Sequence, residues 1–284
     1  MIKGYPEGAL ERIQQIQTEI MDVVSLVCKE FDLTWWADSG TCLGAIRHGG
    51  FIPWDDDVDI ALPIDDYRTF CKVAPQVLPE GYGIYLHGQT ENYPPLFAKV
   101  YKKGTRFIGS QMAEAGFDEG IFIDVFAYGR LDSNKRKAAK QVRDAAFWQR
   151  MSYLYHIAHP KIPTHLPMRA MIGGMAAASH GVVKRLYTPQ SIEKRFWEVF
   201  DRGDGKGLWT NVFYSTWGTY TTGELFPPVD AAFGKLTIPV PHDAHAYLTK
   251  LYGDYMTEPP ESERCTNPPV ILDFGDGVNV MEGK

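Results

Sequence analysis

The segment DSGTCLGAIRHGGFIPWDDDVDI (residues 38–60) decides the fold class of this chain and indicates its chemistry. It holds a small-residue turn, a short stretch of helical character, a Gly-Gly pair and an acidic run that leads into apolar residues. In DVDI (57–60) charged and apolar residues alternate, which is the period of a β-strand. Residues two apart on a strand point to the same face, so Asp57 and Asp59 are predicted to project together.

Two carboxylates on one strand face predict a cation site, because like charges at short range repel unless a cation lies between them. Hard divalent cations prefer oxygen ligands, so Mg²⁺ is the expected ion and Mn²⁺ the alternative. Asp55 and Asp56 are expected to support this site from the adjoining turn, with Asp55 helping to orient it.

The small-residue turn Ser39-Gly40-Thr41 lies upstream of the acidic pair and is predicted to present backbone N–H groups to a phosphate. Residues 41–47 are predicted to form a brief helix whose N-terminus adds a favourable dipole. The alternative is an ordinary turn between a strand and a helix. A phosphate site beside a cation site indicates phosphoryl or nucleotidyl chemistry.

The rest of the chain favours an α/β (α+β) fold, a mixed sheet flanked by helices. Helices are predicted over 9–31 and 65–77 from apolar residues at helical spacing. Beyond residue 133 the composition becomes helical, prolines at 160, 163 and 167 interrupt it, and helices resume at Met168 and Ser191. Strands are predicted at 33–37, 58–62, 82–87, 97–101 and 121–126. We divide the chain into a catalytic core (1–130), a helical region (131–205) and a C-terminal segment that completes the active site (206–284).

Composition narrows the function classes. A net charge of −6 argues against non-specific nucleic-acid binding. The N-terminal residues 1–17 lack a signal-peptide core, and the most apolar stretch, 168–183, falls short of a membrane-spanning helix. Four scattered cysteines, without metal-finger spacing, predict neither a zinc site nor a disulfide framework. A cytoplasmic location is expected, with at most peripheral contact at the inner face of a membrane.

Three motifs together resemble the LicD/fukutin-type phosphotransferases, a branch of the nucleotidyltransferase superfold. The first is the Gly40-Thr41 turn followed by DVD (57–59), the second is Asp124 within IFIDVF (121–126), and the third is LYGDYMTEPP (251–260). They occur in order over most of the chain. The resemblance implies a nucleotidyltransferase-like core and a metal-dependent transferase.

What the resemblance implies about activity is specific. Asp57 and Asp59 would bind Mg²⁺, and Asp124 would be a metal ligand, a general base, or both. The expected reaction moves phosphocholine from CDP-choline to a sugar hydroxyl of a cell-surface glycan or its precursor, which can be lipid-linked, and releases CMP. Alternative donors are a CMP-phosphonate, CDP-ethanolamine, CDP-glycerol or CDP-ribitol. A non-catalytic nucleotide- or glycan-binding relative is the further alternative.

Several other residues are predicted to contact the substrate, each against a plainer interpretation. Arg47 would clamp a diphosphate with two hydrogen bonds, and His48 would lie beside it, whereas both could be surface residues. Lys99 resembles a family lysine that contacts the donor phosphate, against a surface lysine. Trp54 could help to bind a quaternary ammonium, against a core role. The other aromatic candidates are Trp35, Trp36, Trp209, Trp217 and Tyr220. The basic run at 135–143 is predicted to be a solvated helix face, with contact to an anionic glycan or a membrane as the alternative.

Overall fold

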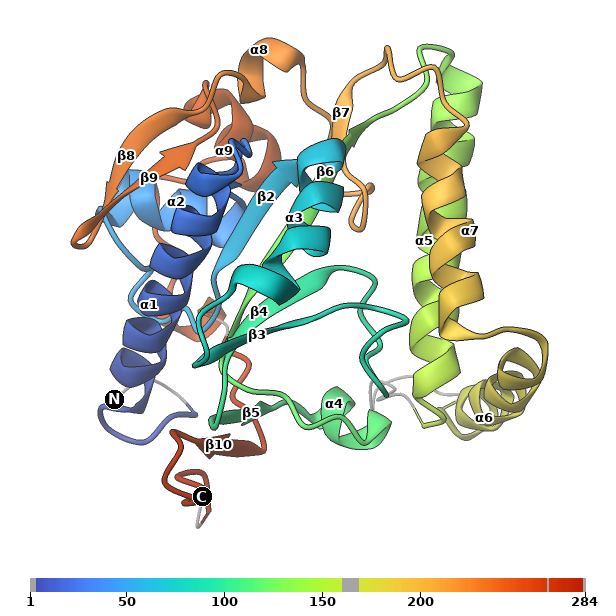
Figure 1. Ribbon diagram of the computed structural model, residues 1–284, viewed down its shortest axis with the longest axis horizontal. Helices are drawn as coiled ribbons and strands as arrows, with labels where there is room; N and C mark the ends of the chain where they lie inside the picture. The colour runs from blue at the N-terminus through green and yellow to red at the C-terminus, as the bar shows by residue number, and fades with distance from the viewer. Residues whose placement is uncertain (1–3, 160–168, 265, 283–284) are drawn as a thin grey trace.

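The computed structural model describes residues 4–159, 169–264 and 266–282, which form a mixed sheet between helices (Figure 1). The strand order is β1-β2-β6-β4-β3, and β7 pairs with β6. Strands β2 and β6 are parallel, and the other pairs are antiparallel. The predicted α/β (α+β) class is confirmed. The strands are β1 (Trp36–Ala37), β2 (Asp59–Pro63), β3 (Tyr82–Tyr85), β4 (Ala98–Lys102), β6 (Phe122–Arg130) and β7 (Trp209–Asn211).

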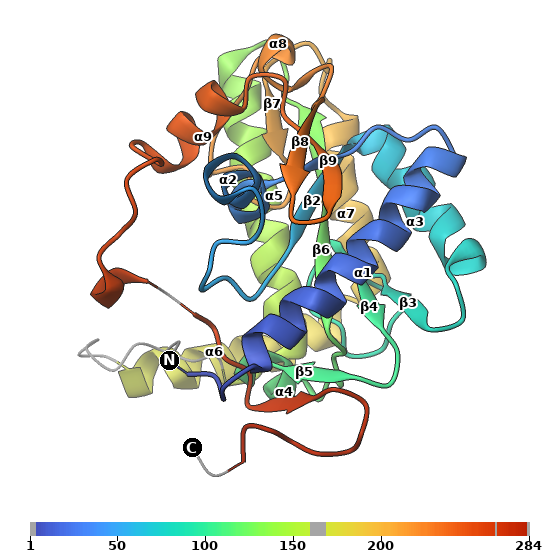
Figure 2. The same cartoon turned by 90° about the vertical axis from the view of Figure 1, so that its left-hand side faces the viewer.

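Two further two-stranded sheets bring C-terminal segments beside the N-terminal half. Strand β5 (Arg106–Ile108) pairs with β10 (Ile271–Asp273), and β8 (Val229–Phe233) pairs with β9 (Leu236–Val240). The β8–β9 pair lies beside β1 and the helix that follows it, as Figures 1 and 2 show. The segment after residue 205 therefore adjoins the region that the acidic motif occupies.

Helices cover both sides of the sheet. Helix α1 (Ala9–Glu30) buries Ile13, Ile20 and Val24, the apolar residues that recur at helical spacing. Together with α3 (Ile64–Val77) it packs against β2, β4 and β6, whereas α5 (Lys135–His156) lies on the opposite side of the sheet (Figures 1 and 2). The remaining helices are α2 (Ser39–His48), α4 (Ser110–Ala115), α5 (Lys135–His156), α6 (Arg169–Leu186), α7 (Pro189–Asp201), α8 (Thr222–Leu225), α9 (Ala244–Tyr252) and the 3₁₀ turn η1 (Glu261–Glu263).

Some predicted boundaries differ from the structure. Residues 39–41 form the first turn of α2 rather than a separate turn, and β1 is confined to Trp36–Ala37. Strand β3 ends at Tyr85 because the chain turns back at Leu86, whose carbonyl accepts from Thr90 N–H. The predicted proline interruption and Cys265 lie outside the described residues. Among the cysteines that the structure describes, Cys28, Cys42 and Cys71 are free thiols.

We examined the length and hydropathy of the helices in residues 4–159, 169–264 and 266–282. None of these helices is both long enough and apolar enough to cross a bilayer.

Candidate active site

A row of charged residues crosses one face of the sheet. Asp59 on β2 is the register partner of Asp124 on β6, and Asp124 is the register partner of Lys99 on β4. At the other end of the row, Asp38 follows β1 and its N–H donates to the carbonyl of Asp59 (2.9 Å). Register partners on adjacent strands point to the same face, so the row runs Asp38, Asp59, Asp124, Lys99.

Asp57 precedes β2 rather than lying within it. The parallel ladder begins at Val58, whose carbonyl accepts from Asp124 N–H (2.8 Å). The carboxyl of Asp57 nevertheless interacts electrostatically with that of Asp124, and its side chain hydrogen-bonds that of Asp55. In the described part of the chain, Asp55, Asp56 and Asp57 each offer an oxygen within 4.8 Å of the others.

The pKa values of the carboxyl groups in this cluster are raised. Burial, followed by the charges of Asp56 and Asp124, raises the pKa of Asp57 to about 6. Burial and then Asp57 raise the pKa of Asp59 well above its usual range. The pKa of Asp124 is raised to about 6, chiefly by burial, although the charge of Lys99 acts in the opposite direction. The cluster therefore holds negative charge only at an energetic cost.

The donor set fits a divalent cation. Half-buried carboxylates that repel one another are the hard oxygen ligands that Mg²⁺ or Mn²⁺ binds, and a cation would lower their pKa values. In addition, Oδ1 of Asp124 is shielded from solvent, and Lys99 Nζ lies 3.3 Å from it. Asp57, Asp59 and Asp124 do not all approach within the 4.8 Å that unites Asp55, Asp56 and Asp57. Asp55 is therefore a candidate cation ligand together with Asp57, in addition to the predicted set.

Hydrogen bonding separates Asp56 from its neighbours. Its Oδ2 accepts from the Tyr5 hydroxyl (2.7 Å) and from Asn267 N–H (3.0 Å). These contacts join the N-terminal and C-terminal segments behind the cluster. These hydrogen bonds tie Asp56 to both terminal segments, and its supporting role at the site stays a prediction.

Lys99 is enclosed at the far end of the row. Its Nζ lies 3.0 Å from Oε1 of Glu119 and 3.3 Å from Oδ1 of Asp124. The lysine side chain is 7% exposed and the glutamate side chain 3% exposed, which excludes the surface-lysine interpretation. Sequence reasoning missed Glu119, whose only signal was an acidic residue just ahead of the IFIDVF strand.

The first turn of α2 packs directly against the aspartates. Ser39 has a left-handed φ of 44°, and its Oγ is buried without a hydrogen-bond partner among the described residues. A Cβ on Gly40 would lie 3.0 Å from Oδ2 of Asp55, so glycine permits the close approach of this carboxylate. Thr41 Oγ1 accepts from Asp59 N–H (2.8 Å) and so ties the helix to β2.

Asp38, which sequence reasoning did not single out, holds this turn in place. It is fully buried and accepts hydrogen bonds from Tyr128 (2.8 Å), Asn211 (3.3 Å) and Tyr247. Tyr247 on α9 also accepts from Ser39 N–H (3.1 Å). Burial raises the pKa of Asp38, and these hydrogen bonds to its carboxylate oppose the rise. Strands β6 and β7 and helix α9 thereby fix the start of α2.

Arg47, His48 and Trp54 lie elsewhere. Arg47 and His48 end α2, about 12 Å along the helix axis from Ser39. Arg47 donates to the carbonyl of Tyr255 (2.6 Å) and to Nε2 of His48 (2.9 Å). The guanidinium of Arg264 lies 4.1 Å from the ring centre of Trp54. The structure therefore groups these three predicted substrate contacts around the C-terminal segment rather than with Ser39, Gly40 and Thr41.

The aromatic candidates are mostly core residues, as the plainer interpretation held. Trp35, Trp36 and Tyr220 are buried, whereas Trp217 is 45% exposed. The Trp217 ring stacks on Tyr214 with a centroid distance of 4.1 Å. Tyr214 in turn packs on Phe126, two residues along β6 from Asp124 and on the same face. Trp209 packs on Phe226 and donates to Thr222.

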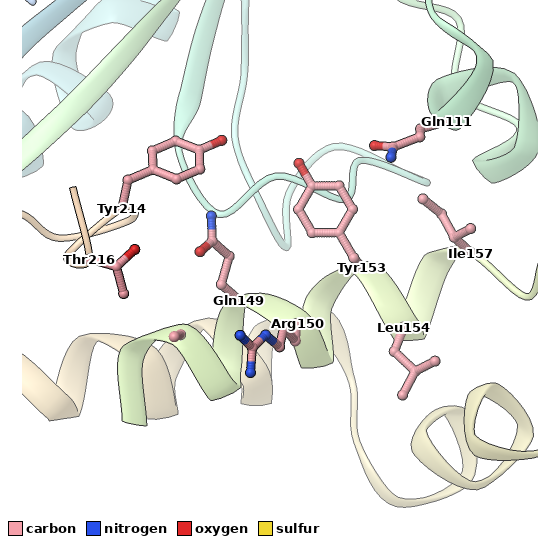
Figure 3. Close-up of a pocket in the computed structure, with 9 residues that line it drawn as sticks. Gln111, Gln149, Arg150, Tyr153, Leu154, Ile157, Tyr214 and Thr216 are labelled. Atoms are coloured by element: carbon pink, nitrogen blue, oxygen red, sulfur yellow. The ribbon is translucent and has the colours of Figure 1, made fainter. Parts of the chain in front are cut away.

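A cavity of about 580 Å³ lies beside this face, between α5, α4 and the loop after β7 (Figure 3). Tyr153 from α5 and Tyr214 from the loop form its inner wall. The negative charge of Asp124 reaches both hydroxyls, and burial raises the pKa of Tyr153 to about 12. The complete lining is Gln111, Ala146, Gln149, Arg150, Tyr153, Leu154, Ile157, Tyr214 and Thr216.

Comparison with known proteins finds similarity to a family of nucleotidyltransferase domains and to several phosphate-group transferases. Residues 32–160 match the family described as LicD/FKTN/FKRP, nucleotidyltransferase domain. The lipopolysaccharide cholinephosphotransferase LicD of Haemophilus influenzae is 24% identical over 90% of this chain and 94% of its own length. The ribitol-5-phosphate transferase FKTN of Mus musculus is 38% identical over 18% of this chain and 11% of its own. The ribitol 5-phosphate transferase FKRP of Homo sapiens is 50% identical over 11% of this chain and 6% of its own.

Proposed function

Because the chain belongs to the LicD/FKTN/FKRP family and is a phosphotransferase, we propose that it moves phosphocholine, or a similar phospho-substituent, from a CDP-activated donor to a sugar hydroxyl of a glycan, with release of CMP. The observation that carries the proposal is the register pairing of Asp59 with Asp124, beside Asp57 and the first turn of α2. This pairing places carboxylates that could hold a divalent cation next to backbone N–H groups that could hold a phosphate.

The reaction is an in-line displacement at the phosphorus that carries the choline. The sugar hydroxyl oxygen forms a bond to this phosphorus while the bond to the bridging oxygen breaks, and that electron pair leaves with CMP. Asp124 takes the hydroxyl proton, since a pKa of about 6 makes it mostly ionised at neutral pH. Asp57 and Asp59, with Asp55 beside them, would hold Mg²⁺, which supplies neutralisation of the diphosphate charge.

Lys99 and Glu119 form a chain of ion pairs with Asp124 at the β4 end of the charged row. Lys99 favours the ionised form of Asp124 and holds its carboxylate toward the face that the substrate would occupy. Glu119 balances the charge of the lysine in a closed environment. This enclosure leaves the lysine without a free path to a donor phosphate, so we assign it to positioning Asp124.

A ribitol phosphate donor is the second candidate. The relatives FKTN and FKRP, named as ribitol phosphate transferases, match this chain over short segments. The same carboxylates and the same α2 turn would serve CDP-ribitol, because only the group beyond the transferred phosphorus differs. CDP-ethanolamine, CDP-glycerol and CMP-phosphonates belong to the same comparison.

The experiment is a CMP-release assay with Mg²⁺ across these donors, each with and without simple glycosides. Asp59→Asn is the test variant, and Asp65→Asn, an exposed aspartate in the first turn of α3, is the matched control. CMP formation from one donor that is lost in Asp59→Asn and kept in Asp65→Asn would identify the transferred group. Equal rates in both variants would refute the assignment of Asp59.

A further inference from the structure

The cavity beside α5 has a polar lining with unused hydrogen-bonding capacity. Gln111, Gln149, Tyr153, Tyr214 and Thr216 all line it, and none of their side chains makes a hydrogen bond to another described residue. Figure 3 shows Gln149 and Tyr153 extending from α5 toward the side where Tyr214 and Gln111 lie. Amides, hydroxyls and an aromatic ring around one space match a ligand that has several hydroxyl groups and apolar C–H faces.

The cavity also carries one cation without an acidic partner. Arg150 lines it, is exposed, and makes no ion pair with any residue that the structure describes. By contrast, Lys140 and Arg143 on the same helix both pair with Asp144. A free guanidinium favours a phosphate or carboxylate on the ligand and disfavours a quaternary ammonium.

The position of the cavity relative to the charged row assigns its side of the reaction. Helix α2 starts directly after Asp38, at the β1 end of the row, whereas Tyr214 packs on Phe126 of β6 and the charge of Asp124 reaches Tyr153. In-line displacement requires the attacking oxygen and the leaving group to lie on opposite sides of the phosphorus. If the donor diphosphate lies at the α2 end, the attacking hydroxyl must arrive from the α5 end.

We propose that the cavity between α5, α4 and the loop after β7 binds the acceptor sugar, with Arg150 contacting an anionic substituent on it. The proposal rests on the proposed function and adds a role for α5, which contributes no residue to the carboxylate cluster. Gln149 and Gln111 bind sugar hydroxyls, and Tyr153 lies between the sugar and Asp124. The acceptor is therefore a glycan sugar that bears a phosphate or a carboxylate.

The test measures sugar binding and donor binding separately on the full chain. Saturation-transfer NMR follows glucose 6-phosphate and methyl glucoside as probes, and thermal stabilisation by CDP with Mg²⁺ follows the donor side. Ala146→Trp fills the cavity, and Ala139→Trp, two turns earlier on the same helix and exposed, is its control. Arg150→Gln removes the cation, with Arg136→Gln as the matched exposed control.

We expect Ala146→Trp to weaken binding of both sugars at least about tenfold, and Arg150→Gln to weaken glucose 6-phosphate about tenfold but methyl glucoside less than twofold. Both controls should bind as the unmodified chain does, and CDP should stabilise every variant. Loss of CDP stabilisation in Ala146→Trp, with sugar binding kept, would place the nucleotide in the cavity and overturn the proposal. Arg150→Gln provides the test on its own if Ala146→Trp does not fold.

Failure of this inference can be told from failure of the proposed function. A chain that CDP stabilises but that binds neither sugar contradicts the acceptor site and leaves the donor chemistry standing. A chain that binds neither CDP nor sugar contradicts both. Choline is a further probe in the same NMR measurement. Displacement of glucose 6-phosphate from the chain by choline would overturn the assignment of Arg150.

Discussion

Asp59 on β2 and Asp124 on β6 are register partners on adjacent parallel strands, so their carboxylates share one face of the sheet. Each is raised in pKa by burial, and the charge of Asp124 further raises the pKa of Asp59. Placing like charges together without a bound cation costs stability, which is a common feature of sites built for catalysis.

The first prediction concerns Asp59→Asn. Removing one charge relieves the repulsion, so the free energy of unfolding at pH 8 without divalent cation should rise by about 1–2 kcal/mol. Turnover should fall by about 10²- to 10³-fold or more. Urea unfolding and CMP release measure the two effects, with Asp65→Asn as control. A variant that loses both activity and stability would indicate that Asp59 serves the fold rather than the reaction.

The second prediction concerns Mg²⁺ and pH. The pKa values of Asp57 and Asp124 are both about 6, so protons compete with a cation below that pH and release the site above it. At tenfold excess over its dissociation constant, Mg²⁺ should add about 1.4 kcal/mol at pH 7.5, or about 3 °C in Tm. The shift should shrink below about 1 °C at pH 5. An equal shift at both pH values, or one that persists in Asp57→Asn, would contradict the metal assignment.

The third prediction concerns the enclosed ion pairs of Lys99. Lys99→Met leaves Glu119 and Asp124 buried without their cation, so the free energy of unfolding should fall by about 3–5 kcal/mol. Lys102→Met is the matched control, because Lys102 is 30% exposed and lies 3.5 Å from Glu19. It should cost less than about 1 kcal/mol.

A double variant distinguishes charge from packing at the same position. Adding Glu119→Gln to Lys99→Met removes one of the two unpaired carboxylates and should restore part of the lost stability. Urea denaturation of the four proteins gives the coupling energy. No recovery in the double variant would mean that the lysine stem, rather than its charge, stabilises the fold.

The fourth prediction concerns His87, which is 2% exposed. Burial, and then the neighbouring His156, lower its pKa from 6.5 to about 4. The folded chain holds this imidazole neutral while the unfolded chain protonates it below pH 6.5, so stability present above that pH is lost as pH falls toward 4. The loss attributable to His87 should reach about 3 kcal/mol.

Thermal unfolding between pH 7 and 4 checks this. His87→Asn should flatten the curve in that window, whereas the exposed His242→Gln should leave it unchanged. If His87→Asn keeps the full slope, the acid sensitivity belongs to other groups.

Local pattern was sufficient to predict much of the fold. Alternation around residues 57–60 predicted a strand over 58–62, and the structure places it one residue later, at Asp59–Pro63. Apolar residues at helical spacing predicted the helix over 9–31, which the structure places at Ala9–Glu30. Both succeed because the period of burial is written into consecutive residues.

Local sequence patterns could not predict the long-range contacts. Asp38 contacts Tyr247, and Arg47 contacts Tyr255, although each pair is more than two hundred positions apart in the chain. Glu119 could be recognised only once β4 brought Lys99 beside it. The local pattern of apolar residues does not determine which strands pair or which helix packs against which turn.

The sequence by itself determined that this chain is an α/β protein, and it predicted a cation site in the acidic motif that follows a small-residue turn, because residue type and spacing set strands, helices and the available ligand atoms. Only the tertiary structure decided which acidic residues share a face, which of them are paired with a lysine, and where the cavity of about 580 Å³ lies. The physical reason is that register and burial, rather than composition, set the distances between charges and their exposure to water, and these control both pKa and binding.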